Sequence, residues 1–296
     1  MCSNKERVVV ITGATGGIGF QSALEIAKTD VRLLITGRNP ERGNEAVQEI
    51  IRETGNKRVE LVLGDLSSIA GIDAVSQDIL SRVEHIDVLV NNAGYFGNEP
   101  RKNDDGIEMH FAVNVLAPWR LTRALSLALE AAGNARVLNI TGGDKPRAID
   151  INNLQAEKGF KGLITYRHSK NAMEAVSLVL AENLKAQNIS VNVLFPGRAA
   201  TAMTGGLSPS ALPGVLKLFY PLFKVLFKDD GGKSAAKAAR STIWAATTPE
   251  LDGLTGRYFN GDMKEHKLDP TAYQAETQDA ILALIKSAEA GALGSL

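Results

Sequence analysis

The sequence predicts one doubly wound α/β domain, in which helices cover both faces of a parallel sheet. Short runs rich in β-branched residues alternate with longer helical segments along about the first 260 residues. Two of these runs, Val8–Ile11 and Val88–Val90, are continuously apolar, as strands buried on both faces are. No Pro/Ser-rich linker and no repeat with a period of about 20 to 50 residues interrupts the alternation.

The predicted strands are the short β-branched runs, and the predicted crossover helices are the longer segments between them. The strands are Arg7–Thr12, Val31–Thr36, Val59–Leu63, Val88–Asn91, Arg136–Ile140, Ser190–Phe195 and Arg257–Phe259. The helices are Gly17–Lys28, Pro40–Thr54, Ile69–Val83, Gly106–Glu130 and Leu163–Lys185. We expect a single domain over residues 1–296, ending in a helix and tail at about 268–296.

The composition is that of an ordinary globular protein, since 44% of the residues are hydrophobic and 22% are charged. Thirty-three basic residues balance 33 acidic ones, which predicts no nucleic-acid partner and favours a small neutral molecule. Cys2 is the only cysteine, which excludes an intrachain disulfide and fits a reducing compartment. The segment Met1–Arg7 carries no signal-peptide hydrophobic region, so we expect a cytoplasmic protein. The four histidines lack metal-ligand spacing, and no metal site is predicted.

A glycine-rich segment follows the first predicted strand and reads Thr12-Gly13-Ala14-Thr15-Gly16-Gly17-Ile18-Gly19. A helix start offers unpaired N–H groups and a positive dipole end, and glycines let a pyrophosphate approach the backbone. A glycine-rich turn without a ligand is the alternative. The position after a buried strand and before an amphipathic helix favours dinucleotide binding. We assign candidate cofactor contacts here to Gly13, Thr15, Gly17, Ile18 and Gly19.

The end of the second predicted strand indicates which dinucleotide is bound. An NAD-binding protein commonly places a carboxylate there for the ribose hydroxyls, but this sequence reads Ile35-Thr36-Gly37-Arg38-Asn39. The planar fork of Arg38 suits a 2′-phosphate, and Arg42 follows one turn later as a second cation. A solvated arginine in a loop is the alternative. The segment favours NADP(H).

Two further strand ends supply candidate cofactor contacts by position. Asp65 ends the third strand, where it can meet the adenine amino group. The segment Asn91-Asn92-Ala93-Gly94 ends the fourth strand, on the same carboxyl edge of the sheet where ligands gather. The residues assigned here are Asp65, Leu66, Asn92, Ala93 and Gly94.

Tyr166 and Lys170 lie four residues apart in a predicted helix and therefore share one face. A free tyrosine has a pKa near ~10, so it is a poor base at neutral pH unless a nearby cation favours its ionised form. Lys170 can supply that charge. The alternative is a packed tyrosine beside a lysine whose amine reaches solvent. Apolar residues continue the same stripe: Met173, Val176, Leu180 and Leu184.

Together these segments resemble the short-chain dehydrogenases/reductases, most closely the retinol-dehydrogenase-like group, over about residues 7 to 260. The motifs in family order are Thr12-Gly13-x-x-x-Gly17-x-Gly19, Asp65-Leu66-Ser67-Ser68, Asn91-Asn92-Ala93-Gly94, Phe111-Ala112-Val113-Asn114, Tyr166-x-x-x-Lys170, Pro196-Gly197 with Thr201, and Gly256-Arg257-Tyr258-Phe259. The resemblance implies a seven-stranded Rossmann sheet and hydride transfer between NADP(H) and a carbonyl or alcohol.

The resemblance also implies a role for individual residues. Tyr166 would donate or accept the proton, Lys170 would bind the nicotinamide ribose, and Asn114 would hold a proton-relay water. Pro196, Gly197 and Thr201 join the candidate cofactor contacts, with Thr201 at the nicotinamide amide.

One family position departs from the expected residue. The fifth strand in the family ends Asn-Val-Ser-Ser, and the second serine helps tyrosine bind the substrate oxygen. This chain reads Asn139-Ile140-Thr141-Gly142-Gly143, so the serine position falls on Gly142. Thr141 carries a hydroxyl and is a candidate substitute, but it serves only if the strand end twists or slips by one residue.

The most apolar stretch, Leu212–Phe227, is too short and too interrupted by proline to cross a bilayer. Three lysines share one helical face and make the stretch compatible with peripheral membrane contact: Lys217, Lys224 and Lys228. In the family, the segment after Pro196-Gly197 covers the substrate. We therefore favour a lid at about 198–232 over a hydrophobic pocket, which predicts a small lipophilic carbonyl or alcohol substrate.

Two functions from different classes remain open at this point. The first is a working NADP(H)-dependent reductase, favoured by Tyr166, Lys170 and Asn114. The second is an NADP-binding regulator that kept the fold and lost the chemistry, favoured by the missing serine. Direction, natural substrate and a homo-oligomeric state are not decided by the sequence.

Overall fold

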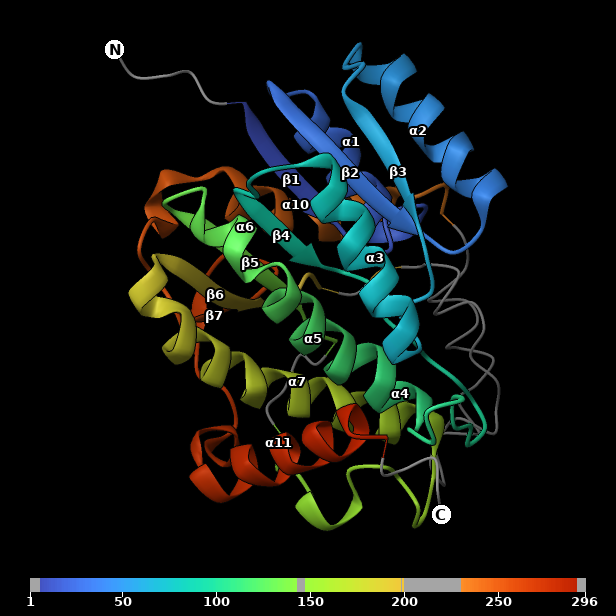
Figure 1. Ribbon diagram of the computed structural model, residues 1–296, viewed down its shortest axis with the longest axis vertical. Helices are drawn as coiled ribbons and strands as arrows, with labels where there is room; N and C mark the ends of the chain where they lie inside the picture. Colours follow the sequence, from blue (N-terminus) through green and yellow to red (C-terminus); the bar gives the residue numbers. More distant parts are fainter. Residues whose placement is uncertain (1–5, 143–146, 198, 200–229, 292–296) are drawn as a thin grey trace.

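The computed structural model describes residues 6–142, 147–197, 199 and 230–291 (Figure 1). Within these residues, one sheet has the strand order β3-β2-β1-β4-β5-β6-β7-β8. Neighbouring strands from β3 to β7 pair in parallel, which confirms the predicted fold class. These strands are β1 (Arg7–Ile11), β2 (Val31–Gly37), β3 (Val59–Leu63), β4 (Val88–Asn91), β5 (Ala135–Ile140), β6 (Ile189–Leu194) and β7 (Tyr258–Phe259).

The sheet ends in a strand that the sequence did not predict. This strand, β8 (Glu265–His266), pairs antiparallel with β7. Both of its residues are exposed, so it has no apolar run from which a strand is predicted.

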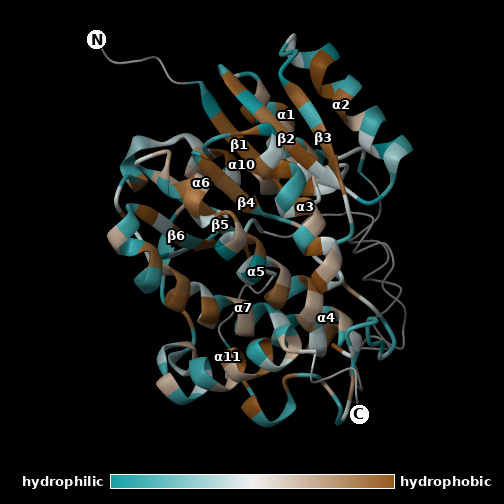
Figure 2. Cartoon of the chain, in the orientation of Figure 1, coloured by the Kyte–Doolittle hydropathy of each residue, from teal (hydrophilic) through white to brown (hydrophobic). Residues whose placement is uncertain are grey.

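Helices cover both faces of the sheet, as the doubly wound prediction requires (Figure 1). Successive residues of β1 point to opposite hydrophobic layers, with Val8 and Val10 in one and Val9 and Ile11 in the other. Helices α3 (Ile69–Arg82), α5 (Ala117–Ala124) and α7 (Gly162–Leu184) contribute to the first layer. Helices α1 (Gly17–Ala27), α2 (Pro40–Thr54) and α10 (Lys233–Thr247) contribute to the second. Figure 2 shows apolar residues concentrated on the central strands between the two layers.

The predicted helix Gly106–Glu130 is wrong as a single helix. The chain forms α4 (Met109–Phe111), a π-helical turn η1 (Ala112–Leu116), α5 and α6 (Ser126–Glu130). Leu125 separates α5 from α6 with φ −92° and ψ 3°, outside helical geometry. Hydrophobic spacing alone does not distinguish one helix from several that share a buried face. The π turn contains Asn114, and such turns frequently lie at functional sites.

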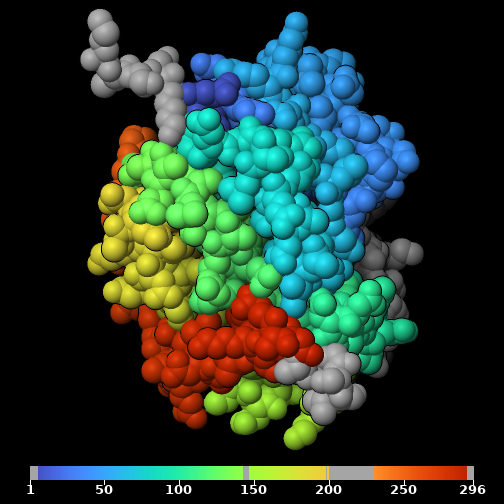
Figure 3. Space-filling view, viewed as in Figure 1, coloured from blue at the N-terminus to red at the C-terminus, as the bar shows by residue number. Residues whose placement is uncertain are grey.

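The last helix, α11 (Ala275–Glu289), packs against α7, and Figure 3 shows its surface beside the residues of α5 and α7. Arg120 on α5 donates to Glu289 on α11 at 2.9 Å and to Asp73 on α3 at 2.7 Å. The predicted C-terminal helix is therefore part of the same packed layer. Among the described helices, none is both long enough and apolar enough to span a membrane.

Candidate functional site

The glycine-rich segment docks against the end of β4. The side-chain amide of Asn92 donates to the carbonyl oxygens of Thr12, at 2.9 Å, and Gly13, at 3.1 Å. Gly13 has φ +63°, and a Cβ atom there would lie 2.8 Å from Ala93 Cα. A Cβ at Gly19 would lie 2.3 Å from Asn92 Nδ2. These two glycines are therefore required for close packing, and the side chain of Asn92 holds the loop in place.

The start of α1 can accept an anion. Its N-cap residue, Gly16, makes no side-chain capping hydrogen bond, and the first turn contains no acidic residue. No anionic side chain of this turn therefore lies beside its N–H groups or beside the positive end of the helix dipole. A Cβ at Gly16 would meet only Arg42 Nη2 at 3.7 Å, so the backbone is open to a close approach. The residues present fit a pyrophosphate at this position.

The two arginines predicted to bind a 2′-phosphate are both exposed, and Arg38 follows Gly37, against which Thr15 of the loop lies. Asn39 caps α2, because its Oδ1 accepts from the backbone N–H of Arg42 at 2.8 Å. This cap places Arg42 in the first turn, with its guanidinium near Gly16. Burial raises the pKa of the Tyr95 phenol, while the charges of Arg101 and Arg38 lower it, so Arg38 acts on the same edge of the sheet as Tyr95.

The remaining cofactor candidates differ in what their side chains do. Leu66 is buried in the hydrophobic layer, whereas Asp65 is exposed and accepts from the N–H of Ser67 at 3.0 Å. The N–H of Ala93 donates to Thr12 Oγ1 at 2.9 Å. Other candidates are near neighbours in the same region: Thr15 lies against Gly37, Ile18 packs with Ala199 and α10, and Gly94 follows Ala93.

Pro196 and Gly197 follow the end of β6 at the carboxyl edge of the sheet. Gly197 has φ +95°, and a Cβ there would meet nothing within 4 Å. Thr201 lies outside the described residues, as does the lid predicted at about 198–232 apart from Ala199 and residues 230–232.

Tyr166 lies near the start of α7, directly beside the end of β5. A Cβ atom at Gly142 would lie 2.3 Å from Tyr166 Oη and 2.7 Å from its ring. The ring also packs edge-on against Phe96, with 5.8 Å between ring centroids. Burial raises the pKa of Tyr166 to about 12, and the charge of Arg167 opposes this shift. Gly142, the position at which the resemblance implies a serine, therefore faces the tyrosine hydroxyl and is covered by that tyrosine.

Lys170 and Thr141 are both buried next to this point. The amine of Lys170 donates to the carbonyl oxygen of Ile140 at 2.9 Å, and burial lowers the pKa of Lys170 to about 8. The hydroxyl of Thr141 donates to Glu174 Oε1 at 2.5 Å. A hydroxyl has a single proton, so Thr141 does not direct a donor toward Tyr166 in this structure.

Asn114 is fully buried, and its side chain joins three segments of the site. Its Oδ1 accepts from the N–H of Tyr95 at 2.8 Å, and its Nδ2 donates to the Tyr95 carbonyl at 3.0 Å. The same Nδ2 donates to Ser169 Oγ at 2.9 Å. Asn114 thereby fixes the segment after β4 against the helix that carries Tyr166.

Sequence reasoning missed a second buried network, formed by Glu108 and His110. His110 Nδ1 lies 2.7 Å from Glu108 Oε1, and its Nε2 accepts from the N–H of Gly97 at 3.1 Å. The ring contacts Tyr95 and Phe96, with centroids 5.0 and 6.2 Å away. Glu108 and His110 thus hold the aromatic segment that reaches Tyr166. The feature of the sequence that could have revealed this network is the Glu-x-His spacing just before Asn114, which has no metal-ligand partners.

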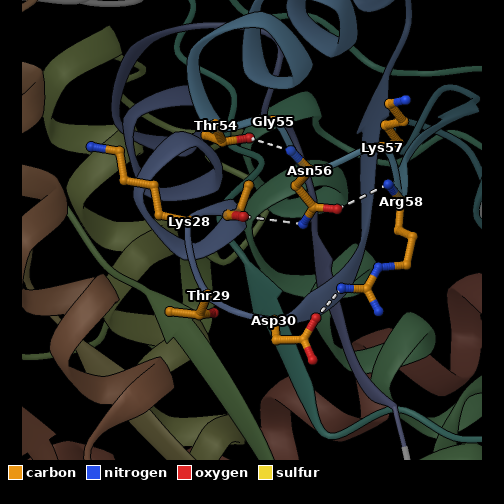
Figure 4. Close-up of a pocket in the computed structure, with 9 residues that line it drawn as sticks. Lys28, Thr29, Asp30, Thr54, Gly55, Asn56, Lys57 and Arg58 are labelled. Carbon is orange, nitrogen blue, oxygen red and sulfur yellow. Dashed lines mark hydrogen bonds and ion pairs between the residues drawn. The ribbon is translucent and has the colours of Figure 1, made fainter.

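A surface depression of about 460 Å³ lies at the opposite, amino end of the strands (Figure 4). The Asn56 amide donates to the carbonyl oxygens of Ala27 and Val31, and Arg58 pairs with Asp30. None of the predicted site residues lines this depression.

Comparisons with known proteins test the family resemblance that the sequence suggests. A family model described as short chain dehydrogenase matches residues 7–211. Retinol dehydrogenase 13 of Mus musculus is 32% identical over 274 residues, covering 91% of this chain and 80% of that protein. Polyprenol dehydrogenase of Homo sapiens is 30% identical over 276 residues, covering 91% and 81%.

Solved structures have the same fold at lower identity. An uncharacterized protein from Mycobacterium paratuberculosis has a TM-score of 0.73 and 22% identity, covering 95% of this chain and 92% of that one. The Pseudomonas aeruginosa RhlG/NADP complex has a TM-score of 0.64 and 23% identity, covering 87% and 95%. The predicted resemblance is confirmed by the family model and the retinol dehydrogenases together, and the chain belongs to the short-chain dehydrogenase/reductase family.

Proposed function

We propose that the protein is an NADP(H)-dependent oxidoreductase that interconverts a lipophilic alcohol and its carbonyl compound. The observation that carries the proposal is the meeting of Tyr166, Lys170 and the end of β5 at one point. This point lies at the carboxyl edge of the sheet, where the glycine-rich loop and the uncapped start of α1 also lie. A cofactor bound by the loop would reach this edge.

The choice of NADP(H) rests on Arg38 and Arg42. Gly37 ends β2, and the residue after it is an arginine rather than the acid that ribose hydroxyls favour. Arg42 is held beside the loop by the Asn39 cap. Two guanidinium groups at this place suit a 2′-phosphate.

The substrate class rests on the relatives and on the aromatic side chains near Tyr166. The named relatives are dehydrogenases of retinol and polyprenol, which are lipophilic alcohols. Phe96 packs against Tyr166, and Tyr95 and Phe160 pack around His110. Aromatic side chains next to the proton donor favour an apolar substrate.

Each polar group of the site has one role in the proposed reaction. NADPH, when bound, supplies the hydride to the carbonyl carbon. Tyr166 donates its proton to the carbonyl oxygen, and Lys170 stabilises the resulting tyrosinate by its charge. Neither Gly142 nor Thr141 offers a hydroxyl proton to the developing oxyanion, which costs about 2.7–4 kcal/mol in comparable sites. We therefore expect turnover ~100- to 1000-fold below that of a relative with the serine.

The cofactor assignment is tested by measuring NADPH and NADH dissociation constants from nicotinamide fluorescence. NADPH should bind at least ~tenfold more tightly, which is about 1.4 kcal/mol. Arg38→Asp should invert this order, because the carboxylate repels the 2′-phosphate and accepts from the ribose hydroxyls. Lys57→Asp makes the same charge change at the opposite end of the sheet and should leave the ratio unchanged. Equal affinity of the unaltered protein for both cofactors would refute the assignment.

A further inference from the structure

A buried carboxylate lies one helical turn beyond Lys170 on α7. Glu174 is only 4% exposed, and its neighbours Met173 and Ala175 belong to the main hydrophobic layer. Burying an ionised carboxylate is costly unless it is paired and hydrogen-bonded. The reaction proposed above uses Tyr166 and Lys170 and gives Glu174 no task.

Two hydrogen bonds join this part of α7 to the end of β5. Thr141 donates to Glu174, and Lys170 donates to the carbonyl oxygen of Ile140. The two strand residues are adjacent, and the two helix residues are one turn apart, so the bonds form a two-point strand–helix clamp. The residue after the clamp, Gly142, is the one that faces the Tyr166 hydroxyl.

The same groups determine the charge beside Tyr166. Burial lowers the pKa of Lys170 to about 8, while the charge of Glu174 raises it. Burial also raises the pKa of Glu174 to about 7, while the Thr141 hydrogen bond and the charge of Lys170 lower it. When it is ionised, Glu174 therefore helps Lys170 to stay protonated.

We infer that Glu174 is a positioning residue, which holds the strand–helix clamp through Thr141 and keeps Lys170 cationic for proton transfer at Tyr166. The inference rests on the proposed function. It assigns Thr141 to the clamp rather than to the substrate oxygen, since the Thr141 proton is used on Glu174. No bond of the substrate is made or broken by Glu174.

Few other charges act on these groups. Asp269, in the segment that precedes the turn Pro270–Tyr273 against α7, raises the pKa of Glu174. Arg167 lowers the pKa of Tyr166. Among the described residues, Glu174 is the one charge that acts on the pKa of Lys170, so its substitution removes that charge.

The decisive variant is Glu174→Gln, which keeps the shape and still accepts from Thr141 but removes the charge. The reductive kcat/KM should be measured from pH 6 to 10 in this variant and in the unaltered protein. Without the carboxylate, Lys170 loses its proton at lower pH, so the alkaline limb should move down by about one pH unit. Glu182→Gln, on an exposed turn of the same helix, is the matched control and should leave the limb in place.

Thr141→Val gives a second and weaker version of the same change. It removes the hydrogen bond that lowers the pKa of Glu174, so Glu174 is less ionised near neutral pH. The alkaline limb should move in the same direction by less than in Glu174→Gln. If circular dichroism shows that Glu174→Gln does not fold, Thr141→Val alone tests the role inferred for Glu174.

The NADPH dissociation constant, measured over the same pH range, separates this inference from the proposed function. Lys170 is assigned to the ribose, so alkaline weakening of NADPH binding should begin at lower pH in Glu174→Gln. If the unaltered protein binds NADPH but reduces none of a panel of apolar aldehydes and ketones, the proposed function fails, and the binding profile still tests Glu174. Identical pH profiles in Glu174→Gln and Glu182→Gln would overturn the inference.

Discussion

At the scale of single residues, the end of β5 lacks the serine that the family resemblance implies. The sequence alone placed the serine position on Gly142 and left Thr141 as an alternative. The structure puts Gly142 against the Tyr166 hydroxyl and turns the Thr141 hydroxyl to Glu174. The partner of a hydroxyl depends on the helix that packs against it, and spacing along the strand carries no information about that helix.

Gly142→Ala should lower kcat, because real Cβ atoms essentially never come within 3.0 Å of a heavy atom outside their own chain neighbourhood and this one would lie 2.3 Å from Tyr166 Oη. A displacement of about 1 Å at a reacting group costs on the order of 100-fold in rate. The NADPH dissociation constant should stay the same, which steady-state kinetics and fluorescence titration would show together.

Gly142→Ser serves as the comparison, because it adds the same Cβ together with a hydroxyl donor. Its kcat should exceed that of Gly142→Ala by up to ~100-fold, the value of one oxyanion donor. A Gly142→Ala variant with unchanged kcat would show that Tyr166 does not need its present position.

At the scale of elements, hydrophobic periodicity predicted the strands β1 to β7 and the helices α1, α2, α3 and α7 to within one or two residues. It failed where an apolar face continues through a change of backbone geometry, as in the π turn around Asn114 and the break at Leu125. It also missed β8, whose two exposed residues form a strand only because β7 lies beside them. The Glu108–His110 network was missed for a similar reason, since its partners come from another segment.

The helix α11 is predicted to be an integral part of the domain rather than an appended tail. Ile281 is fully buried in the same hydrophobic layer as α7, so Ile281→Ala should lower the free energy of unfolding by about 2–5 kcal/mol. Leu127→Ala, at a residue that is 76% exposed, is the control and should change it by less than about 0.5 kcal/mol. Urea denaturation measures both, and equal midpoints for the two variants would mean that α11 does not stabilise the fold.

At the scale of the whole molecule, the parallel sheet separates two ends with different chemistry. The carboxyl end brings together the glycine-rich loop, Arg38 and Tyr166, which lie far apart in the sequence. The amino end carries the depression of Figure 4, where Asn56 and Arg58 bond to neighbouring residues. The edge at which the candidate site lies was predictable, because parallel strands all end on the same side. The protonation of the buried groups on α7, Lys170 and Glu174, was not predictable, because it depends on burial.

The central claim is that Tyr166 transfers the proton that accompanies the hydride, and Tyr166→Phe tests it most directly. The ring stays, so NADPH should bind within about twofold of the unaltered affinity, while single-turnover reduction of an apolar ketone should fall by ~100- to 10,000-fold. Both quantities come from one stopped-flow experiment that follows nicotinamide absorbance and fluorescence. A Tyr166→Phe variant that reduces the ketone at a rate close to that of the unaltered protein would contradict the mechanism.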